Sequence, residues 1–321
     1  MLAQQLAELV GPDGLRLVEV EEPEANGRVV VDVDAAGVSH PDLLRAKGLY
    51  QMKNSVPYVP GAEAAGHVRS APEGSGLTPG QPVAVLAPGG AWQQVVAVHP
   101  GQVFPLPATV STRAAAGMLT NFLTVQFALR RRAKAEPGET VLVHGAAGGV
   151  GTAALHLCRA LGLRSIAVVS DRRKADAAHA AGADAVVKVD GWLEAVREHT
   201  GGRGVDIVLD PVGGDRFADS LRSLAPEGRL VVVGFTGGDI PTVKVNRLLL
   251  RNIAVLGAGL AELLAHDPGY PRRQWDELYP LLSDGRLTVP EPVVHDLADA
   301  AKALSELESR SVIGKIVLST R

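Results

Sequence analysis

The first third of the chain carries short apolar runs that are separated by turn-forming residues. Residues 28–33, 82–86 and 92–98 form such runs, and glycine- and proline-rich segments at 72–76 and 88–90 lie between them. Many short strands with intervening turn signals are typical of an antiparallel sheet or a partial barrel. We therefore predict a mostly-β domain at the start of the chain.

The pattern changes near Ser111, where alanine-rich sequence predicts a helix to about residue 133. A turn at 136–139 follows, and apolar runs then alternate regularly with helical stretches. Continuous apolar runs such as 205–209 suit a parallel sheet that is covered on both faces. We predict strands at 140–145, 165–170, 185–189, 205–212, 229–235 and 253–257, and helices at 149–161, 172–181, 192–200 and 215–224.

After residue 259 the elements become mixed again, and the chain ends in the strand-like run 314–318. A chain of 321 residues exceeds one typical core, so two domains of roughly 150 residues each are expected. We predict a first domain at 1–115 that is completed by 259–321, and a second, α/β domain at 116–258.

The composition is that of an ordinary globular protein, with 46% hydrophobic and 21% charged residues. The net charge of -3 does not indicate electrostatic attraction to nucleic acid or to a membrane surface. The single cysteine, Cys158, excludes an intrachain disulfide and a cysteine-rich zinc site, and it suits a reducing compartment. No secretory pattern or membrane-length apolar run is visible, so we expect a cytoplasmic protein.

The segment from Ala146 to Gly151 reads Ala-Ala-Gly-Gly-Val-Gly between a predicted strand and a predicted helix. A dinucleotide-binding loop needs glycines because its backbone turns tightly and approaches a pyrophosphate, which the N–H groups of the next helix then bind. Ala146 occupies the first glycine position, and Gly148 and Gly151 keep the later two. The alternative, a tight turn that binds nothing, is disfavoured by the surrounding βαβ pattern.

The choice of cofactor depends on the end of the second predicted strand, where an acidic residue would bind a ribose 2′-hydroxyl. This strand ends at Ser170 without a carboxylate, and the cations Arg172, Arg173 and Lys174 follow. Cations at this position suit a 2′-phosphate, so NADPH is favoured. Asp171 leaves NADH open, because a shift of one or two residues would make it the ribose acid.

Eight short motifs are spread along essentially the whole chain: AGVSHPD (36–42), GLY (48–50), VPGAEAAG (59–66), NFLT (121–124), VHGAAGGVG (143–151), DPVGG (210–214), VGF (233–235) and GKIVL (314–318). Taken together, these motifs make the chain resemble the zinc-independent quinone oxidoreductases of the medium-chain dehydrogenase/reductase superfamily. The resemblance implies an α/β protein with a GroES-like first domain, a Rossmann second domain and hydride transfer between them.

The same resemblance argues against zinc. Alcohol dehydrogenases of this superfamily hold a catalytic metal with a Cys near the first motif and a His in the third, where this chain has Ser39 and Ala62. Their structural zinc site uses four cysteines, which a chain with Cys158 alone cannot supply. Glu63 by itself is a poor metal anchor, so we expect no metal.

The resemblance also implies a set of cofactor-binding residues. Thr124 falls beside the nicotinamide carboxamide, and the glycine loop falls under the pyrophosphate. Ser170, Lys174 and Arg310 meet the 2′-phosphate, and Phe235 lines the nicotinamide side. The complete predicted set is Thr124, Ala147, Gly148, Gly149, Val150, Ser170, Arg173, Lys174, Gly234, Phe235, Gly257 and Arg310.

The chemistry that fits is hydride transfer from NADPH to a quinone, enone or enal, whose polarised carbonyl needs mainly orientation and exclusion of water. Tyr50, at the mouth of the substrate pocket by resemblance, could donate to the developing enolate oxygen or merely line the pocket. Ser39 could bind substrate or satisfy backbone. Asp42 is expected to cap a helix that starts at Leu43, and Arg45 is expected to be solvated.

Two departures from the family affect its substrate and cofactor contacts. Many members carry Asn where this chain has Ser39, and some carry Tyr near the adenine where it has Val189. Two other functions remain possible. One is a 2-enoyl thioester reductase with Tyr50 as proton donor, and the other is a non-catalytic NADPH-binding or RNA-binding protein, like the family members that serve as structural proteins of the lens. Nucleic acid is not expected at this net charge. A homodimer through residues 253–257 is expected by resemblance.

Overall fold

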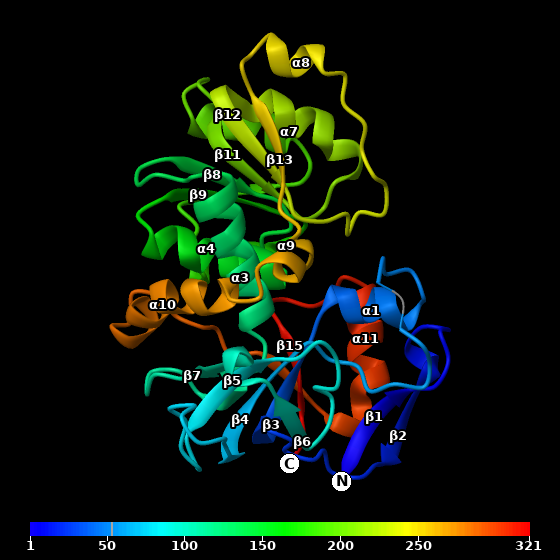
Figure 1. Ribbon diagram of the computed structural model, residues 1–321. Coiled ribbons are helices and arrows are strands. Elements are labelled where there is room, and N and C mark those ends of the chain that lie inside the picture. Colours follow the sequence, from blue (N-terminus) through cyan, green and yellow to red (C-terminus); the bar gives the residue numbers. More distant parts are fainter. Residues whose placement is uncertain (53) are drawn as a thin grey trace. The chain divides into compact units, whose positions relative to one another are not determined.

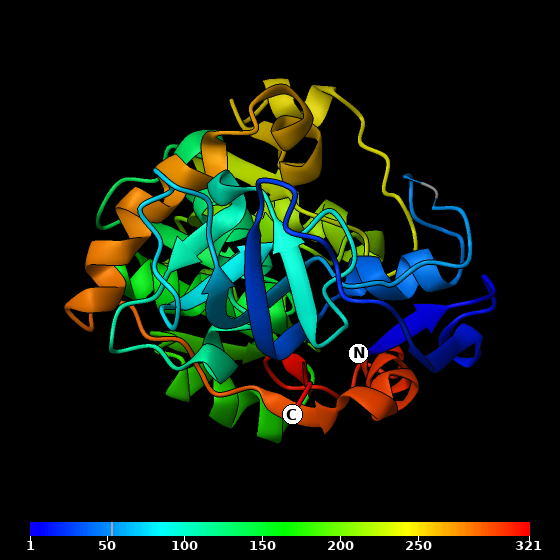
Figure 2. The same ribbon diagram turned by 60° about the horizontal axis from the view of Figure 1, so that its bottom comes forward.

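The computed structural model describes residues 1–52 and 54–321. It divides into two compact units, Met1–Thr120 with Pro271–Arg321, and Asn121–Tyr270. The chain passes from one to the other at residues 120/121 and 270/271, rather than near 115 and 258. The blue N-terminal and red C-terminal segments belong to the same unit (Figures 1 and 2).

A seven-stranded sheet forms the centre of the first unit, with the order β14-β15-β3-β4-β5-β7 and β6 paired to β3. All of these pairings are antiparallel except that of β14 with β15. β15 pairs with β3, so the end of the chain completes the sheet that its beginning starts. The strands are β3 (Val29–Val38), β4 (Glu63–Ser70), β5 (Pro82–Leu86), β6 (Val95–Val98), β7 (Val103–Pro105), β14 (Val293–Asp296) and β15 (Ile316–Ser319).

A separate pair of strands and several helices surround this sheet. β1 (Leu2–Leu6) pairs with β2 (Leu15–Glu19), and α1 (His40–Ala46) packs against α11 (Ala300–Glu308) (Figure 1). The remaining helices of this part of the chain are η1 (Pro12–Gly14), η2 (Pro100–Gln102), α2 (Thr112–Ala115), α10 (Tyr270–Ser283) and η5 (Leu297–Asp299).

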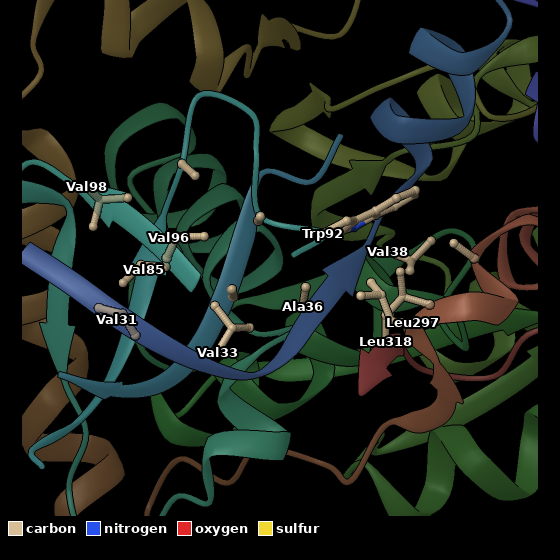
Figure 3. Close-up of a cluster of buried hydrophobic side chains, with 14 of the residues drawn as sticks. Val31, Val33, Ala36, Val38, Val85, Trp92, Val96, Val98, Leu297 and Leu318 are labelled. Atoms are coloured by element: carbon tan, nitrogen blue, oxygen red, sulfur yellow. The ribbon is translucent and has the colours of Figure 1, made fainter. Parts of the chain in front are cut away.

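Alternating residues of β3 and its neighbours form the core of the first unit. Val31, Val33 and Ala36 of β3 are buried beside Val85 and Val96 (Figure 3). The Trp92 indole is fully buried and donates from Nε1 to the Gly37 carbonyl at 2.9 Å, which satisfies its polar atom. Leu297 and Leu318 join the same cluster, so burial of apolar area holds the C-terminal segment in place.

The start of α1 differs from its expected position. The helix begins at His40 with Ser39 as its N-cap, and Asp42 is the third helical residue rather than the cap. Asp42 Oδ2 accepts from the Ser39 backbone N–H at 2.8 Å and also from the Ser39 hydroxyl. The expectation for Asp42 was wrong because a capping box places its acid three residues after the cap.

The second unit holds a parallel six-stranded sheet with the order β10-β9-β8-β11-β12-β13. Relative to the first strand of the unit this order is 3-2-1-4-5-6, which is the Rossmann arrangement. The strands are β8 (Thr140–Val143), β9 (Arg164–Val169), β10 (Ala185–Lys188), β11 (Val205–Asp210), β12 (Leu224–Val232) and β13 (Ala254–Gly257).

Helices connect these strands and cover the sheet (Figure 1). Trp192 and Phe217 bring α6 and α7 onto a core that includes Leu142, Val208 and Leu230 of three strands. The helices are α3 (Leu119–Gln126), α4 (Gly149–Ala160), α5 (Arg172–Ala180), α6 (Trp192–His199), η4 (Gly214–Arg216), α7 (Phe217–Ser223), α8 (Asn246–Leu249) and α9 (Leu260–His266), with a π-helix, η3, at Phe127–Arg132.

The single helix expected over residues 111–133 is divided into α2, α3 and the π-helix. Ser111 caps α2 by accepting from the Ala114 N–H, and the helix stops before Gly117. A Cβ at Gly117 would lie 2.5 Å from Lys315 Cγ. The break therefore brings the backbone against a side chain that lies just before β15, a contact that alanine-rich local sequence does not reveal.

A histidine is fully buried at the end of β8. The His144 ring packs edge-on against Trp192, with ring centroids 4.9 Å apart. Its Nε2 lies 2.9 Å from Ser220 Oγ, and this hydroxyl itself donates to the Arg216 carbonyl, so Nε2 must carry the proton. Nδ1 has no partner among the described residues. Burial lowers the pKa of His144 from 6.5 to about 4.

This burial predicts acid sensitivity. Between pH 6.5 and 4 the unfolded chain binds a proton at residue 144 that the folded chain excludes, so the free energy of unfolding falls as pH falls through this window. The shift corresponds to about 3 kcal/mol. Urea unfolding of wild type and His144→Gln, at pH 7.5 and pH 4.5, should show a smaller pH dependence for the variant, whose amide can still donate to Ser220.

His179→Gln is the matched control, because His179 is exposed. It should retain the wild-type pH dependence. If the free energy of unfolding depends on pH equally in wild type and His144→Gln, the acid sensitivity does not come from His144.

Candidate functional site

The glycine loop lies at the carboxyl edge of the parallel sheet, between β8 and α4. The Ala146 N–H donates to the Val168 carbonyl of β9 at 3.4 Å, and the Gly148 N–H donates to the Gly145 carbonyl at 3.0 Å. Gly145 has a φ of 58°, which favours glycine. These contacts close the loop tightly between two adjacent strands.

Close packing explains which glycine positions matter. A Cβ at Gly151 would lie 2.3 Å from the Gly145 carbonyl oxygen and 2.5 Å from Ala146 Cα. The third glycine of the motif therefore permits α4 to approach the end of β8. Ala146 is fully buried with its methyl group in place, so the first motif position tolerates this small side chain.

The N-terminus of α4 is suited to bind phosphate. Its N-cap is Gly148, which offers no side chain to the first N–H groups of a 12-residue helix. The nearest atom to a Cβ at Gly148 would be the Gly145 carbonyl oxygen at 3.5 Å, whereas a Cβ at Gly149 would stand 2.7 Å from Asn121 Nδ2, so the Asn121 amide lies beside the first turn of the helix. Uncapped N–H groups at the positive end of a helix attract anions, and this end fits a pyrophosphate.

The end of β9 carries a hydrogen-bonded polar group. Lys174 Nζ donates to Ser170 Oγ at 2.9 Å, and Ser170 Oγ donates to Asp171 Oδ2 at 2.9 Å. Asp171 is the N-cap of α5 and accepts the Lys174 backbone N–H at 3.0 Å, which lowers the pKa of its exposed carboxyl. Asp171 therefore caps the helix and also lies 3.6 Å from Lys174 Nζ, so Ser170, Asp171 and Lys174 form one polar cluster; Arg173 is exposed beside them.

Three further strands end at the same edge. Asp210 closes β11, and its Oδ1 accepts the Val212 and Gly213 N–H groups, both at 2.9 Å. Gly234 and Phe235 follow β12, and Gly257 ends β13, where its carbonyl accepts from Arg132 Nε at 2.7 Å. Thr124 lies partly exposed on α3. The sequence could have indicated Asp210, because it is an acidic residue at the end of a predicted strand. The local sequence pattern gave no indication of the Arg132 contact.

In the first unit, Ser39 and Tyr50 lie at the two ends of one helix-turn segment. Arg45 Cζ lies 4.5 Å from the Tyr50 ring centroid, and Arg45 Nη1 lies 3.8 Å from Asp42 Oδ1. The Arg45 side chain is only 14% exposed. The expectation that Arg45 is solvated was therefore wrong, and the spacing of three residues to Asp42 was the signal that could have shown it.

Glu63 and Ala62 belong to the VPGAEAAG motif, where the sequence resemblance led us to expect a metal ligand in zinc-dependent enzymes. Glu63 is buried, its Oε1 accepts from Lys315 Nζ at 2.7 Å, and its Oε2 accepts from the Thr120 N–H at 2.9 Å. Both carboxylate oxygens are thus engaged by protein donors. Across the described residues, no three His, Cys, Asp or Glu side chains are placed to hold a metal ion. Lys315, within the GKIVL motif, was not singled out from sequence.

Arg310 belongs to the first unit, whereas Ser170 and Lys174 belong to the second. It lies near His40, whose pKa is lowered by burial and, to a smaller extent, by Arg310 and Lys47. Lys47 in turn pairs with Glu308. In the part of the chain that the structure describes, no helix has the length and apolarity to cross a bilayer.

Two family patterns match successive parts of the chain. The pattern of the alcohol dehydrogenase GroES-like domain matches residues 25–108, and that of the zinc-binding dehydrogenase family matches residues 149–283. Quinone oxidoreductase-like protein 2 of Bos taurus is 35% identical over 299 residues, which cover 91% of this chain and 85% of the relative.

Two solved structures extend the likeness to three dimensions. A probable oxidoreductase from Mycobacterium abscessus has 43% identity and a TM-score of 0.89, covering 99% of this chain and 98% of that one. The quinone oxidoreductase of Thermus thermophilus, solved also as its complex with NADPH, has 36% identity and a TM-score of 0.86, covering 99% and 100%. The predicted fold, a Rossmann domain with a GroES-like domain, is confirmed, and the chain belongs to the quinone oxidoreductase family of the medium-chain dehydrogenase/reductase superfamily.

Proposed function

We propose that this chain is an NADPH-dependent oxidoreductase that transfers hydride, without zinc, to a quinone or another activated alkene or carbonyl compound. The observation that carries the proposal is the uncapped N-terminus of α4 beside the Ser170–Lys174 pair. The first feature fits the pyrophosphate and the second fits the 2′-phosphate. The Thermus thermophilus relative, crystallised with NADPH, supports the same cofactor.

Independence from zinc rests on the chemistry of the donor set. Ser39 and Ala62 stand where metal ligands would be needed, and Glu63 is held by Lys315 and the Thr120 N–H. These residues are poor zinc ligands. The Ser39 hydroxyl already donates to Asp42, Ala62 has no donor atom, and the Glu63 carboxylate is paired with an ammonium group.

When bound, NADPH supplies the hydride. The N–H groups of Gly149 and Val150 hold the pyrophosphate, with Ala147 and Gly148 shaping the loop beneath it. Ser170, Lys174 and Arg173 hold the 2′-phosphate, with Arg310 as a further cation. Thr124, Gly234, Phe235 and Gly257 orient the nicotinamide end and exclude water from it.

At the acceptor, Tyr50 donates a hydrogen bond to the oxygen on which negative charge develops, and then a proton. Ser39 has its hydroxyl proton engaged by Asp42 Oδ2, so its part is to accept a hydrogen bond or to orient Asp42. Reduction of a 2-enoyl thioester is the alternative reaction, because it would use Tyr50 as proton donor in the same way. The net charge of -3 disfavours a role in RNA binding.

A homodimer is also proposed. β13 is the terminal strand of its sheet, and Val245, Leu249 and Leu250, at the two ends of α8, are 73%, 76% and 77% exposed. An open strand edge next to exposed apolar side chains suits pairing with a second copy. The buried, single cysteine is consistent with a cytoplasmic location.

Turnover provides the direct test. Purified protein should oxidise NADPH in the presence of a 1,4-quinone or an enone, and dialysis against EDTA should leave the rate unchanged. A panel of quinones, enals and crotonyl thioesters separates the two reaction classes. Failure of every acceptor, together with no NADPH binding by calorimetry, would refute the function; loss of rate in EDTA that added zinc restores would refute independence from metal.

Lys174→Ala should weaken NADPH but not NADH. Loss of one charge-assisted contact to a phosphate costs about 1.5–3 kcal/mol, so KM for NADPH should rise by about tenfold to hundredfold. Arg164→Ala is the matched control, because Arg164 is an exposed cation at the opposite end of β9. A similar rise for both cofactors in Lys174→Ala would contradict a 2′-phosphate contact.

The double variant Leu249→Glu/Leu250→Glu should convert the dimer to a monomer, because it places two charges in the proposed interface. Size-exclusion chromatography with light scattering measures the mass directly. Leu17→Glu is the control, since Leu17 is 44% exposed on β2 of the other unit. A monomeric wild type would contradict the proposal.

A further inference from the structure

A C-terminal cap bends the chain back at the end of α1. The Leu49 N–H donates to the Leu44 carbonyl at 2.8 Å, and the Gly48 N–H donates to the Arg45 carbonyl at 2.9 Å. Gly48 has a φ of 67°. These bonds form a Schellman motif, in which glycine adopts the left-handed conformation. The turn returns Tyr50 over the last turn of the helix, onto Arg45.

Arg45 is fixed by two neighbours of different kind. Its guanidinium lies over the Tyr50 ring at 4.5 Å from the centroid, within the range of a cation–π interaction. On its other side lies the Asp42 carboxylate, with Nη1 and Oδ1 separated by 3.8 Å. Arg45 is therefore the cationic link between a buried acid and an aromatic ring.

Asp42 itself is deeply buried, with 2% of its surface exposed. Burial raises the pKa of its carboxyl, while the Ser39 hydrogen bond and the charges of Arg45 and Lys315 act in the opposite direction. A buried carboxylate that has lost water needs cations and donors around it. Asp42 Oδ1 accepts no hydrogen bond from the described residues, and the Arg45 guanidinium, 3.8 Å away, is the cation that faces it.

A second phenol lies within the influence of the same charges. The Tyr58 hydroxyl is buried and has no hydrogen-bond partner among the described residues. Burial raises the pKa of Tyr58, Arg45 lowers it, and Asp42 raises it further. The other charged groups around α1 are His40 and Lys47 on the helix, Glu308 and Arg310 at the end of α11, and Lys315 before β15.

We propose that Arg45 is a positioning residue for Tyr50: it holds the phenol ring through its guanidinium and stabilises the phenolate that remains when Tyr50 gives up its proton. This inference rests on the proposed function. Hydride adds to the β-carbon of the acceptor, the π pair of the alkene moves to the carbonyl oxygen, and Tyr50 protonates that oxygen. The O–H bonding pair stays on Tyr50, and water returns the proton afterwards.

The position of the cation decides the sign of its effect. A guanidinium 4.5 Å from the ring centroid attracts the phenolate more strongly than the neutral phenol, so proton donation becomes easier. Arg45 contacts neither acceptor nor cofactor in this proposal and acts only through Tyr50. Asp42 serves to hold Arg45, and Ser39 serves to hold Asp42.

The chain has 4 tyrosines, so each can be followed separately. In protein labelled with ¹³Cζ-tyrosine, Tyr50→Phe and Tyr58→Phe assign two of the NMR signals. In Arg45→Gln the Tyr50 signal should titrate about one pH unit higher, whereas that of Tyr279 on α10 should not move. Arg45→Lys should keep much of the wild-type midpoint, because it keeps the charge.

Kinetics test whether Arg45 acts through Tyr50. Arg45→Gln should lower kcat about tenfold with little change in KM for NADPH, and its pH profile should shift with the Tyr50 titration. In a Tyr50→Phe background the same substitution should have almost no effect on kcat. If Arg45→Gln folds poorly because Asp42 loses its cation, Asp42→Asn/Arg45→Gln removes both charges together.

The outcomes are separable. An unchanged Tyr50 midpoint in Arg45→Gln, or an equal loss of kcat with and without the Tyr50 hydroxyl, overturns this inference while wild-type turnover stands. If only the Tyr58 signal shifts in Arg45→Gln, Arg45 acts on Tyr58 and not on Tyr50, and the inference is overturned as well. Absence of turnover in the wild type refutes the proposed function itself.

Discussion

The contact between α4 and the end of β8 determines how the second unit presents its phosphate-binding loop. Gly151 lies so close to the Gly145 carbonyl that a Cβ there would stand 2.3 Å from its oxygen. This approach brings the start of α4 directly under the loop, and Gly148 leaves its N–H groups uncapped. The dipole and the N–H groups of the helix then act on the same point at the carboxyl edge of the sheet.

The first unit solves a different problem, which is the burial of charge. Glu63 is paired with Lys315, which lies just before β15. Asp42 is paired with Arg45, which lies three residues later on the same helix. Such pairs contribute little net stability when desolvation is counted, but removal of one partner is costly. In this unit they connect the C-terminal segment to β4 and the end of α1 to its beginning.

The two units divide the proposed chemistry between them. The second unit supplies anion recognition through backbone donors, Ser170 and Lys174, and these need only a rigid sheet edge. The first unit supplies the phenol of Tyr50 and the cation that faces it. Hydride transfer to a polarised acceptor requires little beyond orientation, exclusion of water and a proton donor, and this separation of tasks is sufficient for it.

The sequence alone determined the parallel sheet of the second unit and the strand-rich first unit, because apolar periodicity and turn residues act over a few positions along the chain. It also indicated the glycine loop, since Gly151 and Gly148 serve local backbone geometry. Contacts between distant segments were decided only by the tertiary structure: Lys315 reaches Glu63 across 252 positions, and the alanine-rich run breaks at Gly117 against the same lysine. The burial of Arg45 lies between these cases, because the spacing of three residues to Asp42 was visible in the sequence whereas the burial of Asp42 itself was not.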